Sequence, residues 1–317
     1  MNLPVFDLHC DTALELLDSQ CRPAGRLAKR RGHIDLERGK ALKGYAQLFA
    51  IFTTPGMDPS GRFSPEDIFN AVLANFRREL EENRALLAQV RTAEEIQKTV
   101  EEGRIAAILS VEGPAGIGFD PGRLEELARE GFRMTTLTWN EQNPLAGSHK
   151  TGGGLTAQGR EYVKNAQRYG MAVDVSHLSD EAFWNIMDMT QAPVSASHSN
   201  SRAVWGASRN LTDEQFKAIC ETGGVAGLNL YTDFLGEAPV TLDTACRHVL
   251  HWLELGGEKH IALGGDLDGC ETLPQGFTGV DCWPRLGQAL LEKGVPVETL
   301  EDLFWNNAMR MLKQCSM

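Results

Sequence analysis

Short apolar segments, rich in β-branched residues, alternate along the whole chain with longer segments whose apolar residues recur every three or four positions. The short segments are typical of buried parallel strands, and the longer ones are typical of amphipathic helices. The pattern predicts eight strands, at Leu3–Phe6, Tyr45–Phe52, Ile105–Val111, Phe132–Thr138, Met171–Ser176, Pro193–Ser197, Gly224–Leu230 and His260–Gly265.

Helix-start signals lie between these segments. Ser64-Pro65-Glu66-Asp67 combines an N-cap serine, a proline at the first helical position and acidic residues in the first turn. Apolar residues then recur every four positions as far as Leu80, which predicts one long amphipathic helix. The segments Thr92–Glu95 and Thr212–Gln215 are predicted capping boxes. Further helices are expected at Ala13–Leu17, through 161–169, from Ser179, and as a pair at the end of the chain.

Eight strands connected by helices within 317 residues predict a (β/α)8 TIM barrel of the metal-dependent hydrolase type, with residues 1–317 as a single domain. The alternative is an open doubly wound sheet. That fold commonly carries Gly-x-Gly-x-x-Gly after its first strand, and this chain has no such motif there.

Composition excludes several classes of protein. The net charge of −12 argues against a nucleic-acid partner, which requires a basic surface. The seven cysteines are scattered and form no Cys-x-x-Cys motif, so neither a disulfide framework nor a four-thiolate zinc site is expected. We find no signal peptide and no apolar run long enough to span a bilayer, so we expect no membrane association and a cytoplasmic location.

Polar residues that suit metal binding or proton transfer stand at or just after five of the predicted strands. In a barrel the carboxyl ends of all strands open on one face, so side chains that are far apart in sequence would surround one mouth. An isolated His-x-Asp pair is more often a structural hydrogen bond, but six such residues at five strand ends favour a shared site. They are His9, Asp11, Glu112, His177, His198 and Asp266.

The number of candidate ligands predicts two metal ions. His9 and Asp11 lie two residues apart and can project from one face of a strand, and an imidazole with a carboxylate suits zinc. Three histidines and two carboxylates exceed the ligands of one catalytic zinc, and Glu112 is the natural bridge. Two ions could share a hydroxide that attacks a carbonyl, with Asp266 transferring the proton. Asp268, two residues further on, is the alternative proton carrier.

Six motifs resemble those of the membrane (renal) dipeptidase family, peptidase family M19, within the amidohydrolase-like barrels. They occur in the family's order over nearly the whole chain: His9-x-Asp11, Ser110-Val-Glu112-Gly113, Asp174-Val-Ser-His177, Ser197-His198-Ser199, Ser208-Arg209-Asn210 and Gly265-Asp266-Leu-Asp268-Gly269.

The resemblance implies a binuclear zinc dipeptidase that often accepts a D-residue at the C-terminal position. It implies that His9 and Asp11 hold one zinc, that His177 and His198 hold the other, and that Glu112 bridges them. By the same resemblance Arg209 binds the substrate carboxylate, for which a planar guanidinium is well suited, and the enzyme forms a homodimer.

The segment after the fourth strand departs from the family. Where the family has a histidine that contacts substrate, this chain has Trp139 and Asn140. Trp139 can only donate a hydrogen bond, Asn140 could donate one to a developing oxyanion, and His149 in the following loop is a further candidate. Tyr231 is a candidate pocket residue or a rim aromatic. The departure leaves open a related hydrolase of N-acyl amino acids or lactones, and a non-catalytic metal-binding protein.

Overall fold

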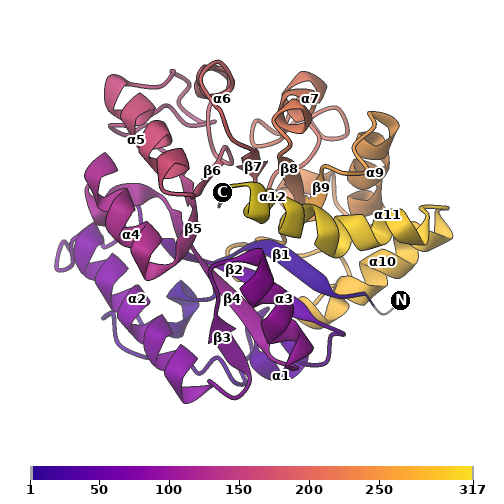
Figure 1. The fold of residues 1–317 in the computed structure, drawn as a ribbon, viewed down its shortest axis with the longest axis horizontal. Coiled ribbons are helices and arrows are strands. Elements are labelled where there is room, and N and C mark those ends of the chain that lie inside the picture. Colours follow the sequence, from indigo (N-terminus) through magenta and orange to yellow (C-terminus); the bar gives the residue numbers. More distant parts are fainter. Residues whose placement is uncertain (1–2, 316–317) are drawn as a thin grey trace.

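The computed structural model describes residues 3–315, which form a closed barrel of parallel strands surrounded by helices (Figure 1). Strands follow one another around the barrel in the order β2-β1-β9-β8-β7-β6-β5-β4, and pairing between β2 and β4 closes it. Phe52 at the end of β2 lies opposite Glu112 at the end of β4. The predicted (β/α)8 barrel is confirmed.

The barrel strands lie where the apolar segments predict them: β1 (Val5–Cys10), β2 (Tyr45–Phe52), β4 (Ile105–Glu112), β5 (Phe132–Thr136), β6 (Ala172–Asp174), β7 (Val194–Ala196), β8 (Val225–Leu228) and β9 (Ile261–Leu263). A further strand, β3 (Leu87–Gln89), pairs with β4 alone and was not predicted, because three residues are too few to show a strand period.

The ends of several strands differ from the prediction. The first strand was expected to end at Phe6, but it continues to Cys10, which pairs with Phe49 and forms a bridge to Leu267. His9 therefore lies within β1, and Asp11 follows it. The strands β5 to β9 are shorter than predicted. β6 ends at Asp174, three residues before His177, whose φ is +70°.

Three predicted helix starts are confirmed, and one of them is Ser179, which caps α6 (Asp180–Met187). Ser64 caps α2 (Pro65–Glu82), and Thr212 forms a capping box with Gln215 at α7 (Asp213–Glu221). Thr92 caps α3 (Ala93–Glu101) as predicted, but the second hydrogen bond of the predicted capping box, from the Thr92 backbone to Glu95, is not formed. The Glu95 carboxylate accepts its hydrogen bond from the backbone N–H of Arg91, at 2.6 Å, rather than from Thr92.

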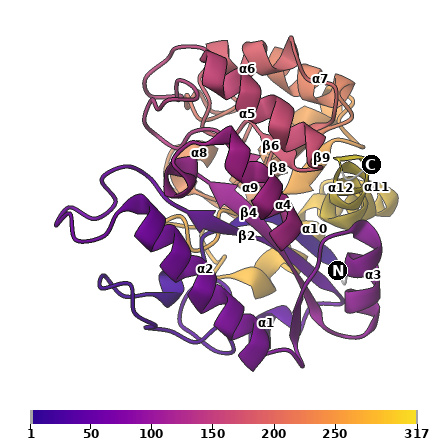
Figure 2. The same ribbon diagram turned by 60° about the vertical axis from the view of Figure 1, so that its left-hand side comes forward.

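The other helices lie around the barrel wall (Figure 2). The predicted helix at Ala13–Leu17 is a single 3-10 turn, Leu14–Leu16. The predicted pair of helices at the end of the chain consists of α10 and a second segment, in which a π-helical turn at Asp302–Asn306 joins α11 to α12. The remaining helices are α1 (Leu36–Gly39), α4 (Leu124–Glu130), α5 (Ala157–Arg168), α8 (Thr232–Leu235), α9 (Leu242–Glu254), α10 (Trp283–Glu292), α11 (Val297–Glu301) and α12 (Asn307–Cys315).

The C-terminal helical segment closes one end of the barrel. Trp305 and Met311 pack with Phe6, Ala106 and Ala262, which lie near the beginnings of their strands. The barrel is therefore open only at the carboxyl ends of its strands, where the polar residues lie. Within residues 3–315 no helix is both long enough and apolar enough to cross a bilayer.

Two glycines allow the strands to approach closely beside the predicted metal ligand His198. A Cβ added at Gly227 would lie 1.9 Å from the Ser197 carbonyl oxygen, and one added at Gly264 would lie 1.7 Å from the same atom. Neither clash can be relieved by a side-chain rotation, because the opposing atom belongs to the backbone.

We therefore expect Gly227→Ala to lower the free energy of unfolding by about 3 kcal/mol, the upper range for overpacking a filled core. Urea unfolding followed by circular dichroism measures this change. Gly206→Ala is the matched control, because a Cβ there meets no atom within 4 Å, and its stability should remain close to that of the parent. Equal stability of the two variants would contradict the close approach.

Candidate metal centre

Glu112, the last residue of β4, lies between the imidazoles of two other strands. Its Oε2 is 3.2 Å from His9 Nε2, whereas its Oε1 is 3.0 Å from His177 Nε2 and 3.6 Å from His198 Nε2. The two oxygens of one carboxylate thus face different imidazoles, Oε2 that of His9 and Oε1 those of His177 and His198. This is the arrangement that a bridging carboxylate between two ions requires.

The other predicted residues complete the two groups of donors. His177 Nε2 and His198 Nε2 lie 3.0 Å apart on the Oε1 side of Glu112. On the Oε2 side, His9 Nε2 lies 3.4 Å from Asp11 Oδ2 and 3.8 Å from Asp266 Oδ1. All of these residues are buried, so the structure brings together the six residues that the strand ends predicted.

The chemistry of these donors fits divalent cations. His9 Nε2 and Asp11 Oδ1 are buried without a hydrogen-bond partner, which is unfavourable unless another group satisfies them. Three carboxylates and three imidazoles converge, and all six side chains are buried. Imidazole nitrogen and carboxylate oxygen are the donors that zinc and similar divalent ions take in catalytic sites.

Burial also sets the protonation of the site. It lowers the pKa of His177 and of His198 well below the usual value, which keeps both imidazoles neutral and able to bind a cation. Burial raises the pKa of Glu112 to about 7, and the positive charge of His9 only partly offsets it. A buried carboxylate in this position is stabilised as an anion by a neighbouring cation.

A chain of hydrogen bonds orients His198. Its Nδ1 lies 2.6 Å from Ser197 Oγ, and that hydroxyl donates a hydrogen bond to Asp174. Asp174 also accepts hydrogen bonds from the backbone N–H groups of Ser176, at 3.0 Å, and of Ser197, at 2.9 Å. Because Nδ1 is engaged in this way, Nε2 is left with a lone pair directed at the site. Sequence reasoning assigned no role to Asp174 or Ser197, although both belong to the quoted motifs.

Asn140 and His149 meet beside His177. Asn140 Oδ1 lies 3.3 Å from His177 Nδ1 and 2.8 Å from His149 Nε2, and His149 Nδ1 lies 2.9 Å from Ser208 Oγ. The backbone N–H of His149 also donates to the His177 carbonyl oxygen, at 2.8 Å. The loop after β5 therefore carries His149 to the site, and the carboxamide oxygen of Asn140 is placed to orient His177.

The turn after β9 separates the roles of two neighbouring aspartates. Asp266 faces the donor cluster, and its Oδ2 accepts a hydrogen bond from Asn229 Nδ2 at 3.0 Å. Asp268 instead accepts hydrogen bonds from the Thr12 hydroxyl at 2.7 Å and from the His33 backbone at 2.6 Å, and it pairs with Arg30. Asp268 thus anchors the loop 26–35. Asn229, which positions Asp266, was not singled out from the sequence.

Three residues of the site are held in the left-handed region of backbone conformation. His177, Asp266 and Asp268 have φ values of +70°, +55° and +66°. Such a conformation costs a residue other than glycine roughly 1–3 kcal/mol, and it persists where the surrounding contacts impose it. At His177 and Asp266 the side chain faces the donor cluster, whereas at Asp268 it faces Arg30 and Thr12.

Arg209 is a buried cation with unused hydrogen-bond donors. Its Nη1 donates to Ser199 Oγ at 2.7 Å, and its guanidinium lies 5.8 Å from the centre of the Phe234 ring. Nε and Nη2 have no partner among residues 3–315, although both are buried. Burial lowers the pKa of Arg209 to about 10, so the group remains charged near neutral pH.

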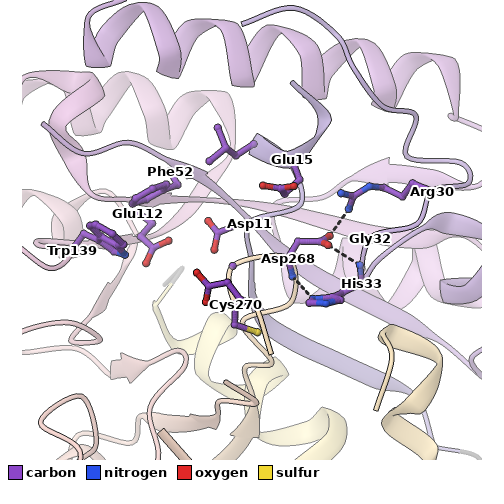
Figure 3. Close-up of a pocket in the computed structure, with 13 residues that line it drawn as sticks. Asp11, Glu15, Arg30, Gly32, His33, Phe52, Glu112, Trp139, Asp268 and Cys270 are labelled. Atoms are coloured by element: carbon purple, nitrogen blue, oxygen red, sulfur yellow. Dashed lines mark hydrogen bonds and ion pairs between the residues drawn. The ribbon is translucent and has the colours of Figure 1, made fainter. Parts of the chain in front are cut away.

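Two cavities open on either side of the donor cluster. The Glu15 cavity, about 460 Å³, is lined by Glu15, Arg30 and Phe52 among others (Figure 3). The Phe234 cavity, about 410 Å³, is lined by Phe234, Tyr231, Asn140 and His149 among others. Both share Asp11, Glu112, Trp139, Gly269 and Glu271. The predicted pocket residues Trp139, Asn140 and Tyr231 therefore line the space around the cluster.

Comparison with known proteins gives consistent matches. The model of the family Membrane dipeptidase (Peptidase family M19) matches residues 1–317. An uncharacterised Klebsiella pneumoniae protein from the pqqA 5′ region is 33% identical over 262 residues, which cover 78% of this chain and 96% of that protein.

Two crystal structures superpose along nearly the whole chain. One is a Rhodobacter sphaeroides metallopeptidase liganded with a phosphinate mimic of L-Ala-D-Ala; it has a TM-score of 0.87 and 28% identity, covering 99% of this chain and 100% of that one. The other is the dipeptidase AC, a metallopeptidase of family M19, with a TM-score of 0.89, 29% identity and 99% coverage of both chains. The chain therefore belongs to the membrane dipeptidase family, peptidase family M19, and is a metallo-dipeptidase.

Proposed function

We propose that this enzyme hydrolyses dipeptides with a free C-terminal carboxylate, including L-D dipeptides, at a centre of two zinc ions. The position of Glu112 carries the proposal, because its two oxygens face different imidazoles: Oε2 lies 3.2 Å from His9 Nε2, and Oε1 lies 3.0 Å from His177 Nε2 and 3.6 Å from His198 Nε2. His9 and Asp11 would hold one ion, His177 and His198 the other, and Glu112 both. We also propose a homodimer and a cytoplasmic location, which follow from the family resemblance and the composition.

The bound ions would supply Lewis acidity and lower the pKa of a water between them toward neutrality. The chain provides the remaining chemistry. Asp266 would accept the proton of the attacking water and return it to the leaving amine, and Asn229 holds its carboxylate in place. His198 and His177 are oriented by Ser197 and Asn140, so the donors are fixed before substrate arrives.

Arg209 supports the choice of substrate. Its unpartnered Nε and Nη2 present two parallel donors in a buried environment, which suits the bidentate binding of a carboxylate. A carboxylate bound there would place the C-terminal residue of a dipeptide in the Phe234 cavity. The superposed Rhodobacter sphaeroides enzyme binds a mimic of L-Ala-D-Ala, which supports the inclusion of D-residues at this position.

The first expected result concerns substrate class. Zinc-loaded protein should hydrolyse members of a panel of L-L and L-D dipeptides, as measured by ninhydrin detection of released amino acids. N-acetylation of the dipeptide should abolish the reaction, whereas an acylase of N-acyl amino acids would tolerate the acetyl group. Failure to cleave any free dipeptide would reject the proposal, and retention of activity on acetylated substrates would favour the alternative hydrolase.

The second expected result concerns metal content. His177→Ala should lower bound zinc from about two ions to about one per chain and abolish activity, because one site loses a ligand. Inductively coupled plasma mass spectrometry of dialysed protein measures the number of zinc ions per chain. His251→Ala is the control, since His251 pairs with Asp213 on the outer helices. Unchanged zinc content in His177→Ala would exclude a ligand role for this imidazole.

The third expected result concerns Arg209. Arg209→Met keeps much of the side-chain length but removes the charged donors, so kcat/KM should fall about 10- to 100-fold, mainly through KM. The comparison uses a dipeptide and its C-terminal amide: the parent should prefer the free acid, and the variant should not. A variant that keeps the preference for the free acid would assign the carboxylate to another residue.

A further inference from the structure

The two cavities divide a bound dipeptide between them, if the proposed function is correct. Arg209 lies against Phe234, a lining residue of the Phe234 cavity, so a substrate carboxylate bound to Arg209 would lie on that side of the donor cluster. The scissile amide lies over Glu112 and its neighbours. The N-terminal residue then extends to the opposite side, where the Glu15 cavity is the available space (Figure 3).

One wall of the Glu15 cavity is aromatic. The rings of Phe52 and Trp139 have their centres 5.2 Å apart at an angle of 59°, and both line the cavity. Phe52 ends β2 opposite Glu112, so this wall begins directly at the donor cluster. A long side chain with an aliphatic stem could lie along these rings while its end reaches the opposite wall.

The opposite wall carries uncompensated negative charge. Arg30, the one arginine of the lining, is already paired with Asp268, with Nη1 to Oδ2 at 2.5 Å and both side chains largely buried. His33 accepts a hydrogen bond from the Asp268 backbone at its Nδ1, and burial lowers its pKa, so it is neutral near pH 7. Because Arg30 is paired and His33 is neutral, Glu15 is the charged residue of this wall that lacks an ion-pair partner among residues 3–315.

The surroundings of Glu15 favour a cation beside it. Within residues 3–315 its carboxylate makes no hydrogen bond and no ion pair. Burial raises the pKa of Glu15, Asp268 raises it further, and Arg30 opposes them, although the net direction remains upward. Among its charged neighbours, the carboxylate of Asp268 acts more strongly on the pKa of Glu15 than the guanidinium of Arg30 does, and Asp11 adds to the effect of Asp268. A cation bound there would relieve the repulsion.

Glu271 extends the negative charge along the rim. It lines both cavities, and with Asp233 it raises the pKa of Tyr231 after the effect of burial. The lining of each cavity contains five carboxylates and one Lys or Arg, which is Arg30 in the Glu15 cavity and Lys150 in the Phe234 cavity. Arg209 lies against Phe234. The two sides differ in which basic donors are free: Arg30 in the Glu15 cavity is paired with Asp268, whereas Arg209 beside the Phe234 cavity keeps two unpartnered donors.

We propose that the Glu15 cavity binds the side chain of the substrate's N-terminal residue and selects lysine or arginine there. The aliphatic stem lies against Phe52 and Trp139, and the cationic end pairs with Glu15. The enzyme is then a dipeptidase for peptides with a basic N-terminal residue. This assignment rests on the proposed function for the orientation of the substrate, and on the charges of the cavity for the choice of side chain.

The test uses zinc-loaded enzyme and compares three dipeptides that end in D-alanine: L-Lys-D-Ala, L-norleucyl-D-Ala and L-Glu-D-Ala. Lysine and norleucine have stems of the same length and differ in charge. We expect kcat/KM for the lysyl substrate to exceed that for the norleucyl substrate about five- to tenfold, with the glutamyl substrate lowest. Because Glu15 is exposed to solvent, ~0.5 M NaCl should reduce the ratio. Free lysine should also inhibit more strongly than free norleucine.

Substitutions of Glu15 test whether its carboxylate binds the cationic end of the substrate side chain. Glu15→Gln should lower the lysyl-to-norleucyl ratio about fivefold, and Glu15→Lys should make the glutamyl substrate better than the lysyl one. Glu298→Gln is the matched control, since Glu298 is an exposed glutamate on α11 outside the site, and it should keep the parental ratio. Circular dichroism and zinc content establish that each variant is folded.

The outcomes separate this inference from the function on which it rests. If none of the three dipeptides is hydrolysed, the proposed function fails. If they are hydrolysed and norleucine equals or exceeds lysine, the inference alone is overturned. A lysine preference that Glu15→Gln leaves intact also overturns it, because the cationic end is then bound elsewhere. The salt dependence and the inhibition by free lysine test the parent enzyme even if a variant does not fold.

Discussion

Closure of the barrel forces carboxylates and imidazoles from five strands into one buried space, and the rest of the site depends on how that charge is balanced. Anions placed close together in a poorly hydrated space repel one another, and burial disfavours each of them. The raised pKa of Glu112 expresses this directly. Divalent cations between the two groups of donors would remove the repulsion and satisfy the unpartnered atoms of His9 and Asp11.

A layer of polar residues beneath the cluster prevents the donors from moving apart. Asp174 and Ser197 connect β6 with β7 and fix His198, while Asn229 connects the end of β8 with Asp266. Gly227 permits the close approach of β8 to β7 at the same level. Since these bonds link neighbouring strands, the spacing of the donors is fixed by the barrel itself rather than by the loops. The loops then shape the two cavities on either side.

Much of this site could be predicted from the sequence because its residues stand at the ends of apolar segments. Glu112, His177 and His198 were found in that way, without knowledge of the register between strands. The end of the first strand could not be found, since Asp7 and His9 interrupt the apolar pattern within it. Functional residues often break local rules in this manner. Contacts such as Asn229 with Asp266 depend on strand register, which apolar patterns alone do not specify.

Other differences come from backbone conformation. Asp266 and Asp268 would point the same way in an extended strand, but both have positive φ, so Asp268 turns toward Arg30 while Asp266 faces the cluster. Asn140 was considered as an oxyanion donor, and the structure places its carboxamide oxygen between His177 and His149. The recurrence of apolar residues along the sequence does not reveal such local turns of the backbone.

The central claim is that two ions lie on opposite sides of one carboxylate. Anomalous diffraction at the zinc edge from crystals of the zinc-loaded enzyme tests it most directly. The account predicts two strong peaks flanking Glu112, one beside His9 and Asp11 and the other beside His177 and His198. A single peak in fully active protein, or peaks at another place in the barrel, would contradict it.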